Sequence, residues 1–323
     1  MQTDSILDAQ TADLGARWLD HMLRGELGVA WTVSDAVLAS RAGVPCYHLP
    51  RHVQYIWNGT PLDEKRVLIR CYHGLGDTIQ FIRYAPLVHA GAREVIVWAQ
   101  PELIPLLRSC RGIDQLEPLH DGSPHAVYDV DVEIMELPHV FRSTLDTLPC
   151  DVPYLSAPSA PRRRHGKFEV LLAVRAGNWD TRRCVPLAML APLAELPGIS
   201  VRLLHAAGEG ERQLFETAHG TETVLGTAAL MRAADLVISV DSMPAHLAGA
   251  LGVPVWTLLR RDADWRWMRE RADSPWYPTM RLFRQAQEGD WTPVIARVCA
   301  ELAELASDQP ALSTAALNPI RAR

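Results

Sequence analysis

The chain has 323 residues, roughly twice the 100–200 residues of a typical domain, so its length predicts two domains and a large core. Hydrophobic residues make up 48% of it and charged residues 22%, proportions that exclude a disordered, collagen-like or coiled-coil protein. The net charge of −6 argues against a surface devoted to nucleic acid or to an anionic membrane, so any site for a polyanion must be local.

The six cysteines contain no C-x-x-C pair, which excludes the usual zinc knuckles and makes a disulfide framework unexpected in so long a chain. The first ten residues are polar and acidic, unlike a secretory leader. The longest uncharged apolar run, 247–259, is shorter than the ~18 residues that a membrane-spanning helix needs. These features predict a reducing, cytoplasmic location with no membrane span.

The first part of the chain has helical periodicity over 12–42, which predicts two short helices, and a proline-punctuated connector follows over 45–61. Strands and helices then alternate, which predicts a parallel sheet with helices on both faces. The predicted strands are 66–72, 94–100 and 115–119, and the predicted helices are 77–90 and 101–109. We assign 1–60 to a helical segment with its connector, and 61–160 to a first Rossmann-like domain.

The segment 156–167 is rich in proline, serine and charge, and it is expected to be a linker. Alternation then restarts, with predicted strands 168–174, 200–205, 236–240 and 253–259 and predicted helices 186–196, 209–218, 228–233, 243–251 and 291–306. A second Rossmann-like domain is therefore expected over 161–306, followed by a mobile tail, 307–323. Two such halves create a cleft at their strand ends, where ligands bind in open α/β sheets.

The first candidate site is the string His73-Gly-Leu-Gly-Asp-Thr-Ile-Gln80, placed between a buried strand and a helix. Gly74 and Gly76 would let the backbone approach a ligand, and Asp77 would stand near the helix N-terminus. The alternative is a helix-capping aspartate on a glycine turn. The string is not a dinucleotide fingerprint, because residue 79 is isoleucine, and no Gly-Lys-Ser/Thr follows it as in a Walker loop.

The second candidate site, 238–254, is a strand that delivers Asp241 and Ser242 to the start of a helix. Free N–H groups at that helix start could hold a diphosphate, and the alternative is an ordinary helix cap. Asp241, Ser242 and His246 are also the residue types of a hydrolase triad. They lie too close together in sequence for that role, and no G-x-S-x-G elbow is present.

Two D-x-D strings, Asp129-Val-Asp131 and Asp262-Ala-Asp264, are short versions of a pattern that can hold a divalent ion. The first lies in an alternating, strand-like run, which favours solvent-facing carboxylates.

Aromatic residues gather in a loop-rich stretch that includes Trp265, Trp276 and Tyr277. Aromatic rings near arginine can stack on a base or on a sugar face. A satellite core beneath a long loop explains them equally well.

Together, the strings 74–84, 235–252, 264–267 and 274–278 resemble the glycosyltransferase family 9 (heptosyltransferase-like) domain found at the C-terminus of bacterial tetratricopeptide-repeat proteins. The string 23–31 is similar to the degenerate last repeat that precedes this domain. The resemblance implies an α/β protein with the GT-B fold: two Rossmann-like domains face each other across a cleft, after a short helical, repeat-like segment.

The resemblance also implies inverting, metal-independent transfer from a nucleotide-diphosphate sugar to a hydroxyl of a glycan, a lipid-linked saccharide or a protein, without a cofactor. Asp77 corresponds to the general base. The implied donor-binding residues are Gly74, Gly76, Arg182, Arg183, Asp241, Ser242, Met243 and His246, and Trp265, Trp276 and Tyr277 would stack on the base or sugar. The sequence 175–183 departs from the Gly-x-Pro-x-His segment of related domains, and Met243 replaces a small residue.

Two other functions fit the same two-domain plan. One is a nucleotide-sugar epimerase or phosphorylase, and the other is a sugar-nucleotide-binding scaffold without turnover, because a fold does not determine a chemistry.

Overall fold

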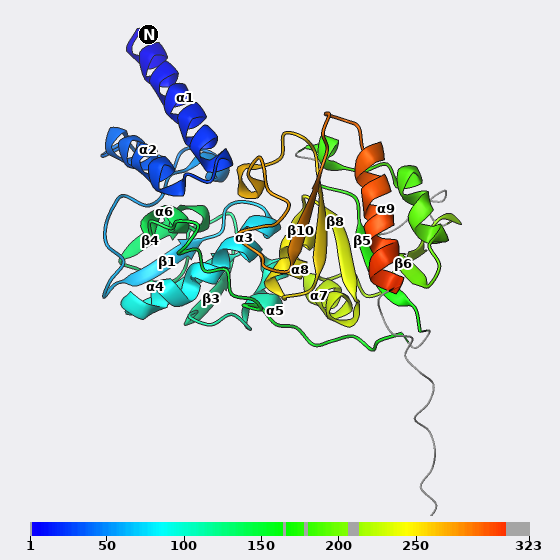
Figure 1. Ribbon diagram of the computed structural model, residues 1–323. Helices are drawn as coiled ribbons and strands as arrows, with labels where there is room; N and C mark the ends of the chain where they lie inside the picture. The colour runs from blue at the N-terminus through cyan, green and yellow to red at the C-terminus, as the bar shows by residue number, and fades with distance from the viewer. Residues whose placement is uncertain (1, 164–165, 178–179, 206–212, 308–323) are drawn as a thin grey trace, which may run out of the picture.

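The computed structural model describes residues 2–163, 166–177, 180–205 and 213–307, with residues 2–12 described as backbone only. Two α/β lobes lie side by side, and a pair of N-terminal helices rests on the first of them (Figure 1). These are α1 (Gln2–Leu23) and α2 (Leu27–Ser40), at the place where two helices were predicted. The predicted mobile tail, apart from residue 307, lies outside the described residues.

The first lobe is built on four parallel strands in the order β3-β2-β1-β4. Its strands are β1 (Arg66–Arg70), β2 (Glu94–Ala99), β3 (Gln115–Pro118) and β4 (Val130–Glu133). The first three confirm the predicted strands, and β4 coincides with the alternating run that contains the first D-x-D string. Burial on both faces explains the nearly continuous apolar sequence of β1 and β2.

Proline shortens the helices of the first lobe. The predicted helix 77–90 consists of α3 (Leu75–Phe81), a 3₁₀ turn (Ile82–Tyr84) and α4 (Ala85–Gly91), with Pro86 in the first turn of α4. A proline donates no backbone hydrogen bond, so the helix stops and restarts there. The remaining short helices follow the same rule: Pro101–Leu103 and α5 (Ile104–Leu107), then Ile134–Glu136 and α6 (Leu137–Val140).

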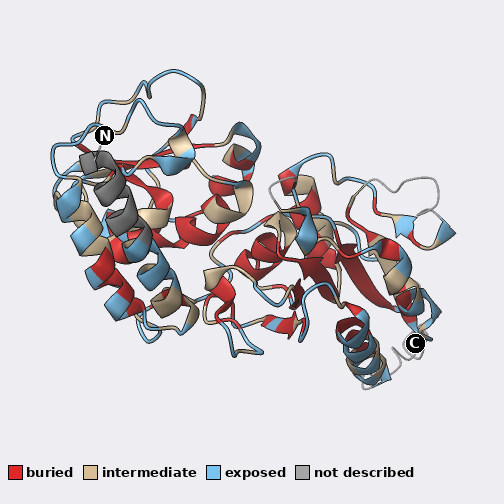
Figure 2. Ribbon diagram, turned by 90° about the horizontal axis from the view of Figure 1, so that it is seen from above, coloured by how far each residue is buried: buried red, intermediate tan, exposed pale blue. Residues whose placement is uncertain are grey.

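The second lobe has six parallel strands in the order β10-β9-β8-β5-β6-β7, and its central strands β5, β8 and β9 are buried along their whole length (Figure 2). They are β5 (Phe168–Ala173), β6 (Ile199–Leu203), β7 (Glu216–Thr217), β8 (Leu236–Val240), β9 (Val255–Leu259) and β10 (Met280–Arg284). Two predictions were wrong here. Strand β7 replaces the end of the predicted helix 209–218, whose residues 209–212 lie outside the described chain. The sequence analysis did not predict strand β10, because its two arginines interrupt the apolar pattern of this five-residue segment.

The helices of the second lobe are α7 (Val224–Ala233), α8 (Met243–Ala250) and α9 (Thr292–Ser307). Helix α7 starts four residues before its prediction, because the Thr223 side chain accepts a hydrogen bond from the Gly226 amide and caps it. The predicted helix 186–196 is a 3₁₀ helix, Leu187–Glu195, that contains Pro192. Shorter 3₁₀ turns are Arg51–Val53, Thr181–Arg183 and Trp265–Trp267.

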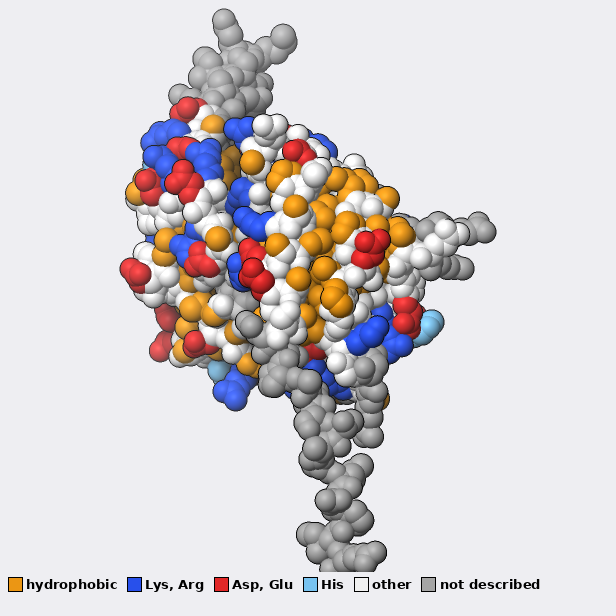
Figure 3. All heavy atoms as spheres, turned by 45° about the vertical axis from the view of Figure 1, so that its right-hand side comes forward, with side chains coloured by type: hydrophobic (Ala, Val, Ile, Leu, Met, Phe, Trp, Pro, Cys, Tyr) orange, Lys and Arg blue, Asp and Glu red, His pale blue; other side chains and the backbone are white. Residues whose placement is uncertain are grey.

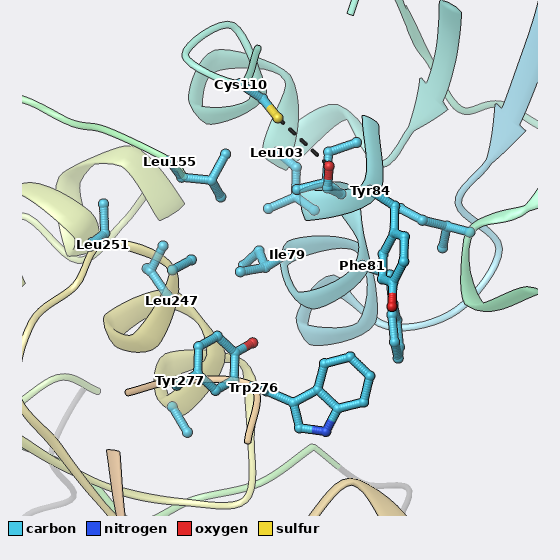
Figure 4. Close-up of a cluster of buried hydrophobic side chains, with 14 of the residues drawn as sticks. Ile79, Phe81, Tyr84, Leu103, Cys110, Leu155, Leu247, Leu251, Trp276 and Tyr277 are labelled. Carbon is cyan, nitrogen blue, oxygen red and sulfur yellow. Dashed lines mark hydrogen bonds between the residues drawn. The ribbon is translucent and has the colours of Figure 1, made fainter. Parts of the chain in front are cut away.

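The two lobes meet where α3 packs against α8. Figure 4 shows Ile79 and Phe81 of α3 facing Leu247 and Trp276, and all four side chains belong to one buried apolar cluster. Gly76 of α3 permits this contact, because a Cβ there would lie 2.8 Å from the His246 ring of α8. On α8 itself, a Cβ on Gly249 would lie 2.4 Å from the Tyr277 ring of the second lobe. The lobes therefore share a continuous core at their junction.

The outer surface agrees with the modest net charge. On the face shown in Figure 3, basic and acidic side chains lie interspersed instead of segregated by sign. That face offers no broad basic surface to a polyanion.

The close contact at α8 predicts opposite effects for two Gly-to-Ala substitutions. Gly249→Ala should lower the free energy of unfolding by about 1–3 kcal/mol, because the new methyl group overlaps the Tyr277 ring. Gly28→Ala in α2 meets no atom within 4 Å and should be neutral or stabilising by up to about 1 kcal/mol. Urea unfolding of both variants measures the difference. Equal free energies of unfolding for the two variants would show that the packing around Gly249 accommodates the added methyl group without cost.

Candidate active site

Asp77 lies in the first turn of α3, at the side of the lobe junction. Its Oδ2 accepts a hydrogen bond from the Gly74 amide at 2.8 Å, and its Oδ1 accepts one from Arg266 Nη2. The side chain keeps 25% of its surface exposed. The capping alternative is thus correct for one carboxylate oxygen, whereas the other faces a charged partner from the second lobe.

Arg266 is the site residue that sequence reasoning missed. It is buried, and besides Asp77 its guanidinium binds Asp264 Oδ1 at 2.8 Å and Gln80 Oε1 at 2.7 Å. Burial alone would lower its pKa, but the charges of Asp264 and Asp77 outweigh this and hold the pKa above its usual value. The string 264–267 contains this arginine, but its pattern indicates only the aromatic residues and the family resemblance.

A cavity of about 490 Å³ opens at the carboxyl ends of β8 and β9. Five arginines line it, and they are Arg183, Arg260, Arg261, Arg269 and Arg284. Asp180, Asp241, Asp262 and Asp264 also line it, and Leu19 and Leu23 of α1 close one side. Its position at the strand ends is where the sequence places the donor site.

The structure distinguishes the two candidate phosphate-binding arginines. Arg183 lines the cavity and donates to the Asp241 carbonyl oxygen at 2.7 Å. Arg182 points to solvent, with 67% of its side chain exposed, and pairs with Asp180 at 2.8 Å. Arg183 is therefore the better placed of the two.

Asp241 and Ser242 end β8 and begin α8, as predicted. Asp241 is 7% exposed, and its burial, together with the nearby Asp264 charge, raises its pKa to about 6. The Ser242 hydroxyl donates to the Val240 carbonyl at 3.3 Å and does not cap α8. No amide in the first turn of α8, which begins at the half-buried Met243, therefore donates a hydrogen bond to the Ser242 side chain.

The arginine-rich cavity is not lined by Gly74, Gly76, Ser242, Met243 or His246, so their predicted contacts with the donor stay predictions. The His246 ring is buried against Trp267 at 5.3 Å and hydrogen-bonds the Tyr277 hydroxyl at 3.0 Å. Burial lowers its pKa far below the usual value, so the ring is neutral. Gly76 makes room for it, because a Cβ there would lie 2.8 Å from His246 Cδ2. Gly74 serves as the N-cap of α3.

Trp276 and Tyr277 are fully buried, so the prediction that they stack on a base or sugar was wrong. The Trp276 Nε1 donates to the Arg266 carbonyl at 3.1 Å, and its ring meets Phe81 edge-on at 5.6 Å. These rings form the core beneath the loop, which was the other interpretation of this stretch. Trp265 is half-buried and available at a cavity wall.

A second cavity, of about 290 Å³, lies between the α1–α2 pair, the connector and the first lobe. Trp18, Trp31, Trp57 and Trp265 line it, and His73 lies at its edge near Asp77. Trp265 lines both cavities and meets Trp18 edge-on at 5.5 Å. The next residue, Arg266, binds Asp77, whose own side chain lines neither cavity.

The first D-x-D string is neutralised within the first sheet. Asp129 pairs with Arg66 at 2.7 Å, and Asp131 pairs with Arg70 at 2.7 Å. Both carboxylates are ion-paired instead of simply solvent-facing. Asp262 and Asp264 instead line the arginine-rich cavity, where Asp264 is held by Arg266.

Over the described ranges, no helix combines the length and the apolar character needed to cross a membrane.

A family model described as glycosyltransferase family 9 (heptosyltransferase) matches residues 198–292. Among curated proteins, Protein FlbA of Caulobacter vibrioides is 24% identical over 325 residues, covering 88% of this chain and 53% of that protein. The chain therefore spans about half the length of this relative.

Two solved structures share the fold. ADP-heptose lps heptosyltransferase II of E. coli aligns with a TM-score of 0.52 and 15% identity, over 76% of this chain and 100% of the other. The glycosyl transferase family 9 protein of Veillonella parvula aligns with a TM-score of 0.51 and 13% identity, over 76% and 99%. The predicted GT-B fold and the predicted family 9 resemblance are confirmed, and the repeat-like nature of α1 and α2 stays a prediction.

The raised pKa of Asp241 predicts a pH-dependent stability. Folding raises this pKa from 3.8 to about 6, so the folded state binds the proton more tightly and stability falls as pH rises through that window. Above it, the buried charge costs about 3 kcal/mol. Asp241→Asn should therefore raise the free energy of unfolding by up to about 3 kcal/mol at pH 8 and by roughly half as much at pH 5. Denaturant unfolding at both pH values measures this, and a gain independent of pH would refute it.

Proposed function

We propose that this chain, whose residues 198–292 carry a glycosyltransferase family 9 domain, moves a sugar from a nucleotide-diphosphate donor to a hydroxyl acceptor, with inversion and without a metal ion. One observation carries the proposal. The Asp77 carboxylate binds Arg266, the residue that follows Trp265, and Trp265 lines both an arginine-rich cavity and an aromatic cavity. The first cavity suits a polyanionic donor, and the second suits an acceptor.

The donor cavity has the charge that a diphosphate requires. Guanidinium groups bind phosphate oxygens in pairs and stay charged at every relevant pH. Arg260 follows the end of β9, Arg183 lies in the 3₁₀ turn Thr181–Arg183, and the positive end of the α8 dipole lies at Ser242. This arrangement supports binding of the diphosphate in the second lobe, with the sugar directed toward Asp77.

The chemistry is a single displacement. Asp77 accepts the proton of the acceptor hydroxyl while that oxygen bonds to the anomeric carbon, and the bond from that carbon to the diphosphate oxygen breaks. Attack from the face opposite the leaving group inverts the anomeric centre. Arg266 holds the Asp77 carboxylate in place, and the cavity arginines stabilise the charge on the departing diphosphate.

The two rival functions require different cavities. An epimerase needs no acceptor site, and a phosphorylase needs cations to bind a second phosphate. The described residues of the aromatic cavity include neither lysine nor arginine. This lining favours a transferase with an uncharged acceptor over both rivals, and incubation with labelled nucleotide sugars separates all of them from a scaffold without turnover.

The state of the cysteines supports a cytoplasmic location. All six thiols are free in the structure, and Cys71 and Cys110 are buried. Such a set is typical of proteins from a reducing compartment.

Substituting Asp77 should separate catalysis from structure. Asp77→Asn keeps an acceptor for the Gly74 amide but removes the basic carboxylate, so kcat should fall by ~10²–10⁴ while nucleoside-diphosphate affinity stays nearly intact. Steady-state kinetics and calorimetry on one preparation give both quantities.

Asp264→Asn is the matched control for that substitution. It also removes one carboxylate partner of Arg266, but it leaves the proposed base in place. Its kcat at saturating donor should stay within about tenfold of the wild type. Equal losses in the two variants would mean that Asp77 acts only by neutralising Arg266.

Turnover should survive chelation. The cavity arginines are placed to neutralise the diphosphate, so the reaction should keep its rate in excess EDTA. The rate of nucleoside-diphosphate release with and without EDTA measures this. Abolition by EDTA with recovery in Mn²⁺ would point to Asp262 and Asp264 as metal ligands.

A further inference from the structure

Helix α1 supplies an apolar wall to the arginine-rich cavity. Leu19 and Leu23 line the cavity from α1, and Ala263 and Trp265 line it from the second lobe. The two leucines are four residues apart, so they lie on the same face of the helix. Leu19 keeps 43% of its surface exposed. A ligand that covers such apolar surface is stabilised, because the surface is removed from water.

Contacts with the second lobe hold α1 at the cavity. Asp20 Oδ1 accepts a hydrogen bond from Arg269 Nη1 at 3.0 Å, and the Arg269 amide donates to the Leu23 carbonyl oxygen at 3.0 Å. Trp18 meets the Trp265 ring edge-on at 5.5 Å. Figure 1 shows the end of α1 beside this part of the second lobe. These contacts anchor the leucines of α1 at the cavity.

The loop opposite α1 is held by a second arginine. Arg284, at the end of β10, donates to the carbonyl oxygens of Trp267 and Met268. The same loop carries Trp265 and Arg269, the two residues that contact α1. Both faces of the apolar wall are therefore positioned by the protein itself, which lowers the ordering cost of binding.

The polar part of the cavity lies at the start of α8. Arg260 Nη1 lies 2.8 Å from Asp180 Oδ2, and Arg183 Nε donates to the Asp180 carbonyl oxygen at 3.3 Å. Arg183 also donates to the carbonyl oxygen of Asp241, the residue before the N-cap of α8. Two guanidinium groups beside a helix N-terminus suit a diphosphate.

The apolar wall lies toward α3, the helix that carries the proposed base. The Trp265 ring stacks on Phe81 of α3 at 6.2 Å, and the following residue, Arg266, binds Asp77 of the same helix. In the proposed transfer the sugar lies between the diphosphate and the base, because its anomeric carbon is attacked there. The sugar ring is therefore expected at the apolar wall and the diphosphate at the start of α8.

The side chains at the wall match the two kinds of surface that a sugar has. Leucine and tryptophan can cover the C–H face of the ring. The carboxylates of Asp262 and Asp264 line the same cavity and are the acceptor type that sugar hydroxyls require. A hydroxyl that faces a leucine loses its water without gaining a partner, so the wall favours a sugar that presents few hydroxyls to α1.

We propose that α1 completes the donor site and helps to select the sugar. Leu19 and Leu23, together with Trp265, contact the sugar of the nucleotide-diphosphate donor, and Arg183 and Arg260 hold its diphosphate. The inference rests on the proposed function for the nature of the donor. It makes a helix outside both Rossmann-like lobes a determinant of sugar specificity.

The test measures the contribution of the sugar to binding, without any acceptor. Calorimetry on the full chain compares ADP with ADP-glucose, UDP with UDP-glucose and GDP with GDP-mannose, and the tightest-binding pair is used. Leu19→Ala and Leu23→Ala shorten the wall. Leu305→Ala is the matched control, because this α9 leucine is 39% exposed and lines neither cavity.

Leu19→Ala and Leu23→Ala should each weaken binding of the nucleotide sugar about fivefold and change the Kd of the nucleoside diphosphate by less than about twofold. Leu305→Ala should change neither. Equal weakening of both ligands would place the nucleoside at α1 and overturn the assignment of the sugar, and unchanged Kd values in both leucine variants would overturn it altogether. A wild-type chain that binds none of the six nucleotides would refute the proposed function as well, whereas binding that is indifferent to α1 would leave that function standing.

Discussion

A buried cation, Arg266, joins the two lobes beside the proposed base. The Arg266 guanidinium cannot lie in a low-dielectric interior without partners, and it takes one carboxylate from each lobe, Asp77 and Asp264. Removing either acid would leave part of a buried charge uncompensated, which is far more costly than losing a surface ion pair. The position of the proposed base is therefore determined by the second lobe as much as by α3, the helix that carries it.

Helix packing makes this ion pair possible. Helices α3 and α8 approach closely because Gly76 leaves room for the His246 ring, and within the second lobe Gly249 leaves room for Tyr277. The neutral His246 ring fills the space between the two helices and forms a hydrogen bond with the Tyr277 hydroxyl. Gly76 and His246, which the sequence motifs suggested as ligand contacts, thus hold the two lobes together. The proposed donor contacts are then the arginines that line the cavity.

Local pattern was enough to predict most strands, the two N-terminal helices and the position of Asp241 at the end of β8, because alternation and apolar runs are properties of short segments. It failed at β7 and β10, whose sequences are too short or too charged to show a pattern. It also failed for Arg266 and Trp276. Their roles come from contacts between segments nearly 200 residues apart, and no periodicity encodes such pairings.

Helix α1 belongs to the walls of both cavities. Trp18 lines the aromatic one, Leu19 and Leu23 line the arginine-rich one, and Arg269 ties the helix to the second lobe through Asp20 and the Leu23 carbonyl. A rigid helix moves as one body, so any displacement of α1 changes the shape of both cavities at the same time. The two cavities are therefore mechanically coupled through this helix.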